Sequence, residues 1–218
     1  GFEQQKLSLK HQWTGSHFSS KTHLSMVNLN QETAGYIRGK NTYQDPLLWK
    51  TNPNPEAFRD AQALRLSSQI SGTGNNANQW QITPYLRHSS MNFLQHYLPG
   101  KPLEKNGQTS GGIQSSLKQS LNNNTSLWLG ADLEWARMWV EEFQANPLGT
   151  ADNVRYQGQH YDFEVDSQQL AAFANLEWKP SDQLTAEVGL RAETINYDYQ
   201  NNMLAGTSRD DGGACNST

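Results

Sequence analysis

One stretch of this chain alternates strictly between apolar and polar residues, and this alternation limits the folds that the chain can adopt. Between Thr125 and Trp135, one residue set is Leu127, Leu129, Ala131, Leu133 and Trp135, and the other is Trp128, Gly130, Asp132 and Glu134. Successive side chains of a β-strand point to opposite sides of the sheet. The segment therefore predicts a strand with one apolar face and one face that carries carboxylates.

The same rule predicts further strands. Residues 169–178 and 183–193 repeat the alternation clearly, and weaker versions contain Leu7 to Trp13, Leu64 to Ile70, Trp80 to Leu86 and Ile113 to Leu121. Residues 22–30 read as extended, with an ambiguous facing. Together these segments give roughly eight strands, many of about a dozen residues, whereas globular strands usually have about five or six. Such lengths favour membrane strands, which need about 9 to 11 residues.

The expected connections between these strands alternate in length. Short polar turns are predicted at 14–21, 72–78, 122–124 and 179–182, and long loops at 31–60, 91–106 and 144–166, with another starting near residue 200. Outer-membrane barrels place tight turns on the periplasmic side and large loops outside. A β-propeller would instead need four short strands in each repeat, so the pattern favours a barrel.

Composition explains how such a chain could fold with few apolar residues. Its 218 residues are 35% hydrophobic, below the roughly 45–50% of an average globular protein. A barrel tolerates this shortage because its apolar side chains face lipid and its interior stays polar. No window approaches the roughly 20 apolar residues of a membrane-spanning helix, and no signal peptide is recognisable. The net charge of −4 with scattered basic residues argues against a nucleic-acid partner.

Several segments resemble the barrel of TonB-dependent outer-membrane receptors. The resemblance rests on Ile82 to Gly100 followed by Glu104 to Gly107, on Leu129 to Glu134, on Leu170 to Trp178, and on Val188 to Arg191. It extends over essentially the whole chain. It implies an all-β fold, namely a portion of an antiparallel up-and-down transmembrane β-barrel, with roughly eight long strands arranged as four hairpins.

The resemblance also implies a place for this piece in a larger protein. Residues 1–218 would form part of a single β-barrel domain of about 22 strands, with the plug domain and the closing carboxy-terminal strand outside the piece. The ending around Cys215 is similar to an extracellular loop that often holds a second cysteine, which the piece lacks. The expected location is the bacterial outer membrane.

The function that the resemblance implies is transport. Such receptors bind and import a scarce nutrient, most often a ferric chelate such as a ferric siderophore, and the expected partners are the TonB complex through the plug, a ferric chelate at the extracellular loops, and outer-membrane lipid. Neither a cofactor nor an enzymatic activity is expected. The strand pattern assigns eight charged residues to the polar face as candidates for the barrel lumen: Arg65, Arg87, Lys118, Asp132, Glu134, Glu177, Glu187 and Arg191. Trp13, Trp80, Trp135 and Trp178 are expected near strand ends as membrane-interface aromatics.

Motifs of other functions are weaker. Ser115-x-x-Lys118 matches one motif of penicillin-recognising enzymes, but no Lys-Thr-Gly follows. Gly72 to Ala77 precedes a strand rather than a helix, so we interpret it as a turn and not as a dinucleotide loop. The histidines at 17, 23, 88 and 96 lack the helical spacing of a zinc site.

Two alternatives to the interpretation as a receptor barrel stay open at this point. One is a secreted all-β carbohydrate-binding or glycoside-hydrolase domain, in which tryptophans stack on sugars and two carboxylates act as acid and base. The other is a complete eight-stranded barrel. A sandwich must bury its apolar stripes against a second sheet, whereas a barrel turns them outward, and this difference discriminates between the classes.

Overall fold

A computed structural model describes residues 1–74, 78–96, 100–147 and 157–203. Within these ranges the chain forms one short 3-10 helix, η1 (Thr42–Gln44), and eight strands. The strands are β1 (Phe2–Thr14), β2 (Phe18–Glu32), β3 (Phe58–Thr73), β4 (Gln79–Leu94), β5 (Leu103–Asn122), β6 (Thr125–Gln144), β7 (Gly158–Ser181) and β8 (Leu184–Asn201).

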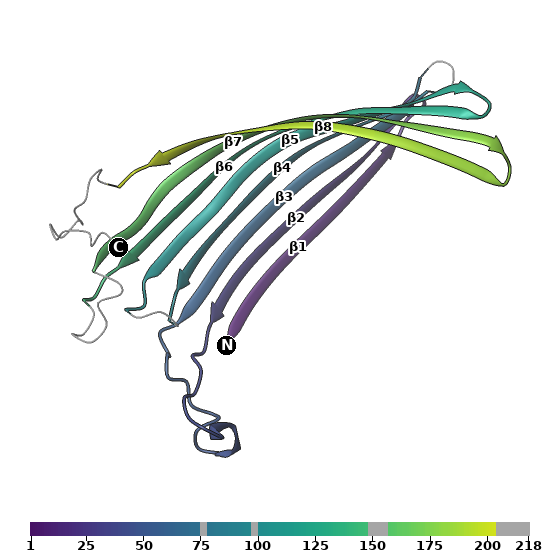
Figure 1. The fold of residues 1–218 in the computed structure, drawn as a ribbon. Coiled ribbons are helices and arrows are strands. Elements are labelled where there is room, and N and C mark those ends of the chain that lie inside the picture. Colours follow the sequence, from purple (N-terminus) through teal and green to yellow (C-terminus); the bar gives the residue numbers. More distant parts are fainter. Residues whose placement is uncertain (75–77, 97–99, 148–156, 204–218) are drawn as a thin grey trace.

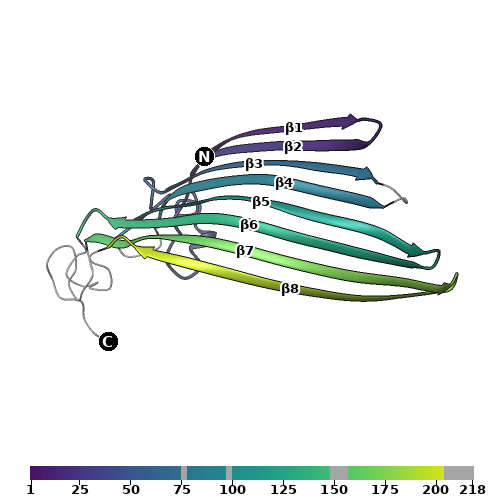
Figure 2. The same cartoon turned by 90° about the horizontal axis from the view of Figure 1, so that it is seen from above.

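The eight strands form one antiparallel sheet in which each strand pairs with its neighbours in sequence. The sheet is curved like a trough, with the short connections at one end and the long ones at the other (Figures 1 and 2). This all-β, up-and-down meander confirms the expected fold class. In the part of the chain that the structure describes, no helix is long and apolar enough to cross a membrane.

The strand register assigns every side chain to one of two faces, because residues directly opposite each other in neighbouring strands point to the same side. Leu133 pairs with Ile113 and with Leu170, which places these three on one face. We call this the outer face and the opposite one the inner face. The outer face carries a continuous apolar band formed by Leu7, Leu9, Leu24, Met26, Leu64, Leu66, Ile70, Ile82, Leu86, Ile113, Leu117, Leu129, Leu133, Leu170, Leu176, Val188 and Leu190.

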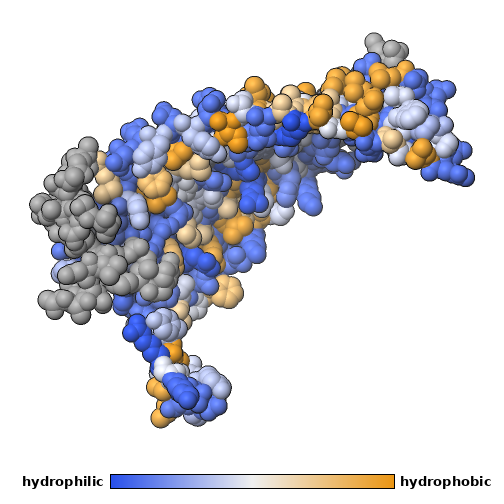
Figure 3. Space-filling model, in the orientation of Figure 1, coloured by the Kyte–Doolittle hydropathy of each residue, from blue (hydrophilic) through white to orange (hydrophobic). Residues whose placement is uncertain are grey.

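No second layer covers this band in the described chain. Leu133 and Leu190 are 54% and 79% exposed, and the buried hydrophobic residues of the described ranges are three alanines, Ala57, Ala136 and Ala171. Figure 3 shows apolar side chains gathered along the arched edge of the sheet towards its short-turn end. In the described residues these side chains are not buried against a second sheet, as they would be in a sandwich.

The strands extend further into the expected loops than the alternation predicts. The loops expected at 31–60, 91–106 and 144–166 shrink to the connections 33–57, 95–102 and 145–157. The turn expected at 14–21 is also shorter, since β2 already begins at Phe18. The turn expected at 122–124 lies between the end of β5 at Asn122 and the start of β6 at Thr125. The turn expected at 179–182 is instead at 182–183, because β7 continues to Ser181.

The strand expected at β6 ends early because its apolar residues change from one face to the other along the strand. On β6 the outer face is apolar up to Trp135 and continues with Arg137, Trp139 and Glu141. The inner face carries Asp132 and Glu134 and continues with Ala136, Met138 and Val140. A strand predicted from one continuous apolar face therefore ends at this crossover, whereas β6 continues to Gln144.

The crossover also corrects the position of one tryptophan. Trp13, Trp80 and Trp178 lie near the short-turn ends of their strands, as expected, but Trp135 lies in the middle of β6. Trp135 is the last outer residue before Arg137, so it marks the long-loop edge of the apolar band rather than a strand end. These four tryptophans therefore lie at both edges of the band, where interface aromatics are expected.

The assignment of side chains to the two faces can be tested with two adjacent residues of β5 that lie level with the centre of the band. In the full-length protein, Leu117→Arg should lower the free energy of unfolding by about 2–4 kcal/mol, because it places a charge on the lipid side near the bilayer midplane. Ser116→Arg on the inner face should cost far less. Reversible unfolding in lipid vesicles measures both, and equal costs would contradict the outward-facing band.

Candidate functional site

The eight charged candidates from the sequence lie on the inner face. The register connects Arg87 to Arg65 on β3 and to Ser110 on β5, and it connects Asp132 and Glu134 through β7 to β8. Lys118, Glu177, Glu187 and Arg191 occupy inner positions of β5, β7 and β8 by the same pairing. The structure brings some of these residues into direct contact and leaves others apart.

Glu134 on β6 is the centre of one contact group. Arg87 Nη2 lies 2.5 Å from Glu134 Oε1, and the Tyr85 hydroxyl donates to Glu134 Oε2. Arg87 Nε also donates to Ser110 Oγ at 3.0 Å. The carboxylate thus receives two donors from β4, one of them charged, and such charge-assisted hydrogen bonds are stronger than neutral ones.

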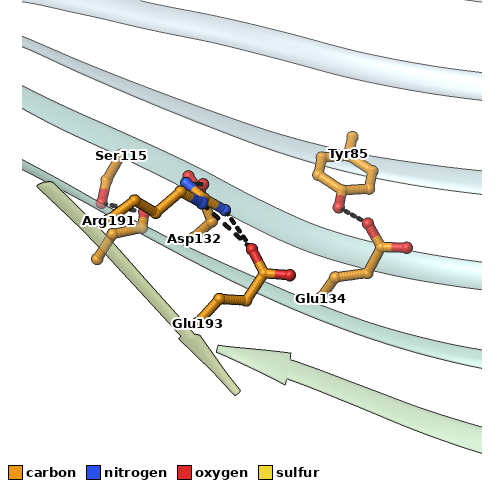
Figure 4. Close-up of polar contacts among 7 residues, drawn as sticks. Tyr85, Ser115, Asp132, Glu134, Arg191 and Glu193 are labelled. Carbon is orange, nitrogen blue, oxygen red and sulfur yellow. Dashed lines mark hydrogen bonds and ion pairs between the residues drawn. The ribbon is translucent and has the colours of Figure 1, made fainter. Parts of the chain in front are cut away.

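Asp132, two residues before Glu134 on the same face, is held by β8 instead. Arg191 Nη1 donates to Asp132 Oδ2 at 2.8 Å, while Arg191 Nη2 donates to Glu193 Oε2 at 3.0 Å. Figure 4 shows the Arg191 side chain between the two carboxylates. The two groups together form a charged network, composed of Tyr85, Arg87, Ser110, Asp132, Glu134, Arg191 and Glu193, that ties β4 to β8.

Tyr85 reaches Glu134 because the strand between them has a glycine at the crossing point. Tyr85 pairs with Gly112 on β5, which pairs in turn with Glu134 on β6. A Cβ atom at Gly112 would lie 2.6 Å from the Tyr85 hydroxyl and 2.4 Å from the Leu133 carbonyl oxygen. Since such distances are not tolerated, a larger residue would force the ring or the backbone to move. The sequence pattern did not single out Tyr85 or Ser110. Tyr85 could have been recognised because it precedes Arg87 by two residues and therefore shares its face of β4.

The inner face next to this network is hollowed. A hollow of about 470 Å³ is lined by residues of β2 to β6, among them His23, Arg65, Arg87 and Glu134. Arg65 lies directly opposite Arg87 in the register, and like charges in that position repel. Glu134 neutralises Arg87, so the hollow has an excess of positive charge at Arg65.

The remaining candidates lie outside the network. Lys118 Nζ lies 4.7 Å from the centre of the Trp128 ring, and Glu177 forms an ion pair of 3.0 Å with Lys179. Glu187 is exposed opposite Glu177. These contacts keep charged groups on the inner face but do not bring them together at one point.

The catalytic and metal motifs do not assemble in the structure. Ser115 and Lys118 are three residues apart on β5, so their side chains point to opposite faces, and Ser115 Oγ donates to the Ala131 carbonyl oxygen at 2.9 Å. Among the described residues, no group of three histidine, cysteine or acidic side chains could hold a metal ion. Gly72 and Thr73 end β3, whereas residues 75–77 lie outside the described ranges, as does Cys215.

The long connections at the other end of the sheet contact each other. Lys101 in the 95–102 connection forms an ion pair with Glu56 in the 33–57 connection. This neighbouring ammonium lowers the pKa of the Glu56 carboxyl below its usual value. The contact therefore stabilises this loop pair at neutral pH and is lost as the pH falls through the lowered pKa.

Comparisons with known proteins agree with this architecture. The family model described as TonB dependent receptor-like, beta-barrel matches residues 9–214. The crystal structure of the ferric citrate transporter FecA in its unliganded form superposes with a TM-score of 0.71 at 12% sequence identity. The match covers 92% of this chain and 30% of that chain, so the present chain spans about a third of that structure's length. None of the curated proteins matches.

Two neighbouring glycines provide a test of the Tyr85 crossing. Gly112→Ala should lower the free energy of unfolding of the full-length protein by about 1–3 kcal/mol, the usual cost of overpacking a well-filled site. Gly111→Ala is the matched control, because its Cβ would meet its nearest atom at an ordinary 3.5 Å. Urea titration of both variants in the same detergent measures the difference. A Gly112→Ala variant as stable as Gly111→Ala would show that Tyr85 does not cross β5 as described.

Proposed function

Because the chain belongs to the TonB-dependent receptor β-barrel family, we propose that it is part of an outer-membrane receptor that binds and imports a scarce nutrient. The observation that carries this proposal is the single curved sheet, with an uncovered apolar band outside and a charged network inside. Only lipid can satisfy such a band along its whole length, and a wet or protein-filled interior suits the charged face.

The polarity along the strands supports a specific orientation. Beyond Trp135 the outer face carries ion pairs, including Arg137 with Asp166 at 2.8 Å and Lys105 with Glu141 at 3.5 Å. These charged pairs lie towards the long connections and away from the band. In our proposal this end projects from the outer membrane into the exterior, and the short turns lie on the periplasmic side.

The proposed role of the charged inner face is to hold a plug domain. Arg65 opposite Arg87 leaves one guanidinium in the hollow that a carboxylate of another domain could neutralise. The network residues Glu134 and Asp132 are already bound to arginines, so they stiffen the wall rather than offer reactive groups. Through such a plug the receptor would contact the TonB complex.

The proposed cargo is a ferric chelate of the siderophore class, imported without chemical change. The support is the family and the fold that the chain shares with a ferric citrate transporter. The charged network also favours binding over catalysis, because its acids are paired with Arg87 and Arg191 instead of forming a nucleophile, base and orienting partner.

The orientation can be tested by labelling with a membrane-impermeant thiol reagent. In intact cells that express the full-length protein with Cys215→Ser, Lys50→Cys in the 33–57 connection should be labelled. Asn123→Cys in the β5–β6 turn should react only after the outer membrane is permeabilised. Labelling of Asn123→Cys alone in intact cells would reverse the proposed topology.

Iron uptake tests the function itself. Deletion of the gene should reduce accumulation of radioactive iron from siderophore-containing medium under iron limitation, and the full-length gene should restore it. Replacing residues 38–52 by a short Gly-Ser linker should weaken uptake while leaving the amount of receptor in the outer membrane unchanged, because loops on a rigid wall carry binding. Unchanged iron uptake in the deletion strain would contradict the proposal.

A further inference from the structure

The inner face of β1 to β4 differs in charge from the inner face of β5 to β8. The inner positions of β1 to β4 carry no aspartate or glutamate. Their charged side chains are basic, namely Lys6, Lys10, Lys21, Arg59, Arg65 and Arg87. The inner positions of β5 to β8 are rich in acids instead, among them Glu134, Glu177 and Glu187. Basic and acidic residues are therefore segregated to different strands of the inner wall.

We call Lys6, Lys10, Lys21, Arg59 and Arg65 the basic strip. Arg87 binds Glu134, whereas no residue of the basic strip forms an ion pair within the described ranges. Arg59 Nη2 donates to Gln31 Oε1 at 2.7 Å, and this neutral acceptor leaves the guanidinium charge uncompensated. Because the strip also repels Arg87, which lies directly opposite Arg65, anions from another source would stabilise it.

The positions of Lys21 and Arg65 indicate where such anions come from. Lys21 belongs to β2 and Arg65 to β3, and the described sheet contains both neighbours of each of these strands. Those neighbours, β1 to β4, supply no acidic residue at an inner position. A strand added at the free edge of β1 would lie next to Lys6 and Lys10, but β1 and β2 would separate it from Arg65. The anions that compensate Lys21 and Arg65 are therefore expected from the lumen.

The wall around these two cations allows another molecule to approach closely. The hollow of about 470 Å³ lies beside Arg65. A second hollow, of about 380 Å³, is lined by Ser19, Ser71 and Gln81 among others. Lys21 lies in the row of side chains between the two hollows. Hydroxyl and amide side chains can donate and accept hydrogen bonds, so this wall suits the side chains of a packed polypeptide surface.

The length of the basic strip fits a protein domain better than a small solute. Lys21 pairs with Gln69, which lies ten residues after Arg59 on β3. At about 3.3 Å per residue, the strip is about 33 Å long. A domain of about 100 residues has a radius of gyration of about 13 Å, so one of its faces can contact most of the strip. Barrels of about 22 strands that act as transporters hold such a domain in the lumen as a plug.

From these observations we infer that the basic strip is the docking surface for a carboxylate-bearing face of the plug domain, and that this contact sets how the plug is rotated inside the barrel. Carboxylates of the plug pair with Lys21 and Arg65 in this orientation. The reverse orientation leaves both cations covered and unpaired, and it places the plug carboxylates against the acid-rich strands. The inference rests on the proposed function, since it names the plug surface that such a receptor holds against β1 to β3.

Zero-length cross-linking with a water-soluble carbodiimide tests this contact in the purified full-length receptor. The reagent activates a carboxylate, and a lysine amine in contact with it forms an amide while the carbodiimide leaves as a urea. Mass spectrometry of the digested receptor should find Lys21 joined to an aspartate or glutamate of the plug. The internal positive control is the outer pair of Lys105 and Glu141, whose Nζ and Oε2 atoms lie 3.5 Å apart.

Two glutamine variants of β3 provide a matched comparison. Gln69→Glu places a carboxylate directly opposite Lys21 on the inner face. It should lower the yield of the product between Lys21 and the plug at least about threefold, a factor within the range of an exposed ion pair. Gln62→Glu makes the same change on the outer face and should leave that yield unchanged.

The possible results separate the inference from the proposed function. If the control product forms but Lys21 is not joined to the plug, the inference is wrong, and iron uptake in the gene-deletion strain still decides the proposed function. Equal yields of plug product at Lys21 and at Lys118 on β5 would contradict the orientation. If no plug product forms and Lys21→Glu with Arg65→Glu lowers uptake of ferric citrate, the strip contacts the solute and the inference is overturned.

Discussion

The structure depends on an uninterrupted antiparallel ladder that has no second layer. Each strand pairs only with its sequence neighbours, and nothing in the described chain packs on the outer leucines. Backbone hydrogen bonds can hold such a sheet together, but they cannot remove its apolar band from water. Lipid is the environment that makes the band favourable, and once the band faces lipid the inner face must accommodate charges. The ion pairs of Glu134 and Asp132 are therefore a consequence of the single layer.

Glycine positions decide which side chains can meet across an intervening strand. Tyr85 crosses β5 over Gly112 to reach Glu134, and on the outer face the Trp139 ring lies over Gly107 and stacks on His88 at 6.0 Å. In both cases an aromatic ring takes the space of a missing Cβ. These crossings connect β4 to β6, two strands that are not paired with each other in the sheet.

The sequence predicted the class of fold, and it placed the eight charged residues on one common face of the sheet, because the period-two pattern reports facing directly. It placed Asp132 and Glu134 on the same face as Arg191, but it could not show that Arg191 binds Asp132 while Arg87 binds Glu134, because these partners depend on register between strands up to 59 residues apart. The strand ends were misjudged for a related reason. At Trp135 the apolar residues move from the outer to the inner face, so the alternation on one face ends there. The hydrogen-bonded pairing of β5 with β6 nevertheless continues beyond Trp135.

This crossover links the fold to its proposed use. If the outer face stayed apolar to the ends of the strands, the band would exceed the hydrocarbon thickness, since β6 and β7 are far longer than the roughly 9–11 residues that span it. Moving the apolar residues inward at Trp135 limits the band to the membrane and leaves the projecting strand ends wet outside and apolar inside. The same residue pattern that fits the sheet to lipid thus places apolar and aromatic side chains on the inner face of β6, β7 and β8 towards the long connections.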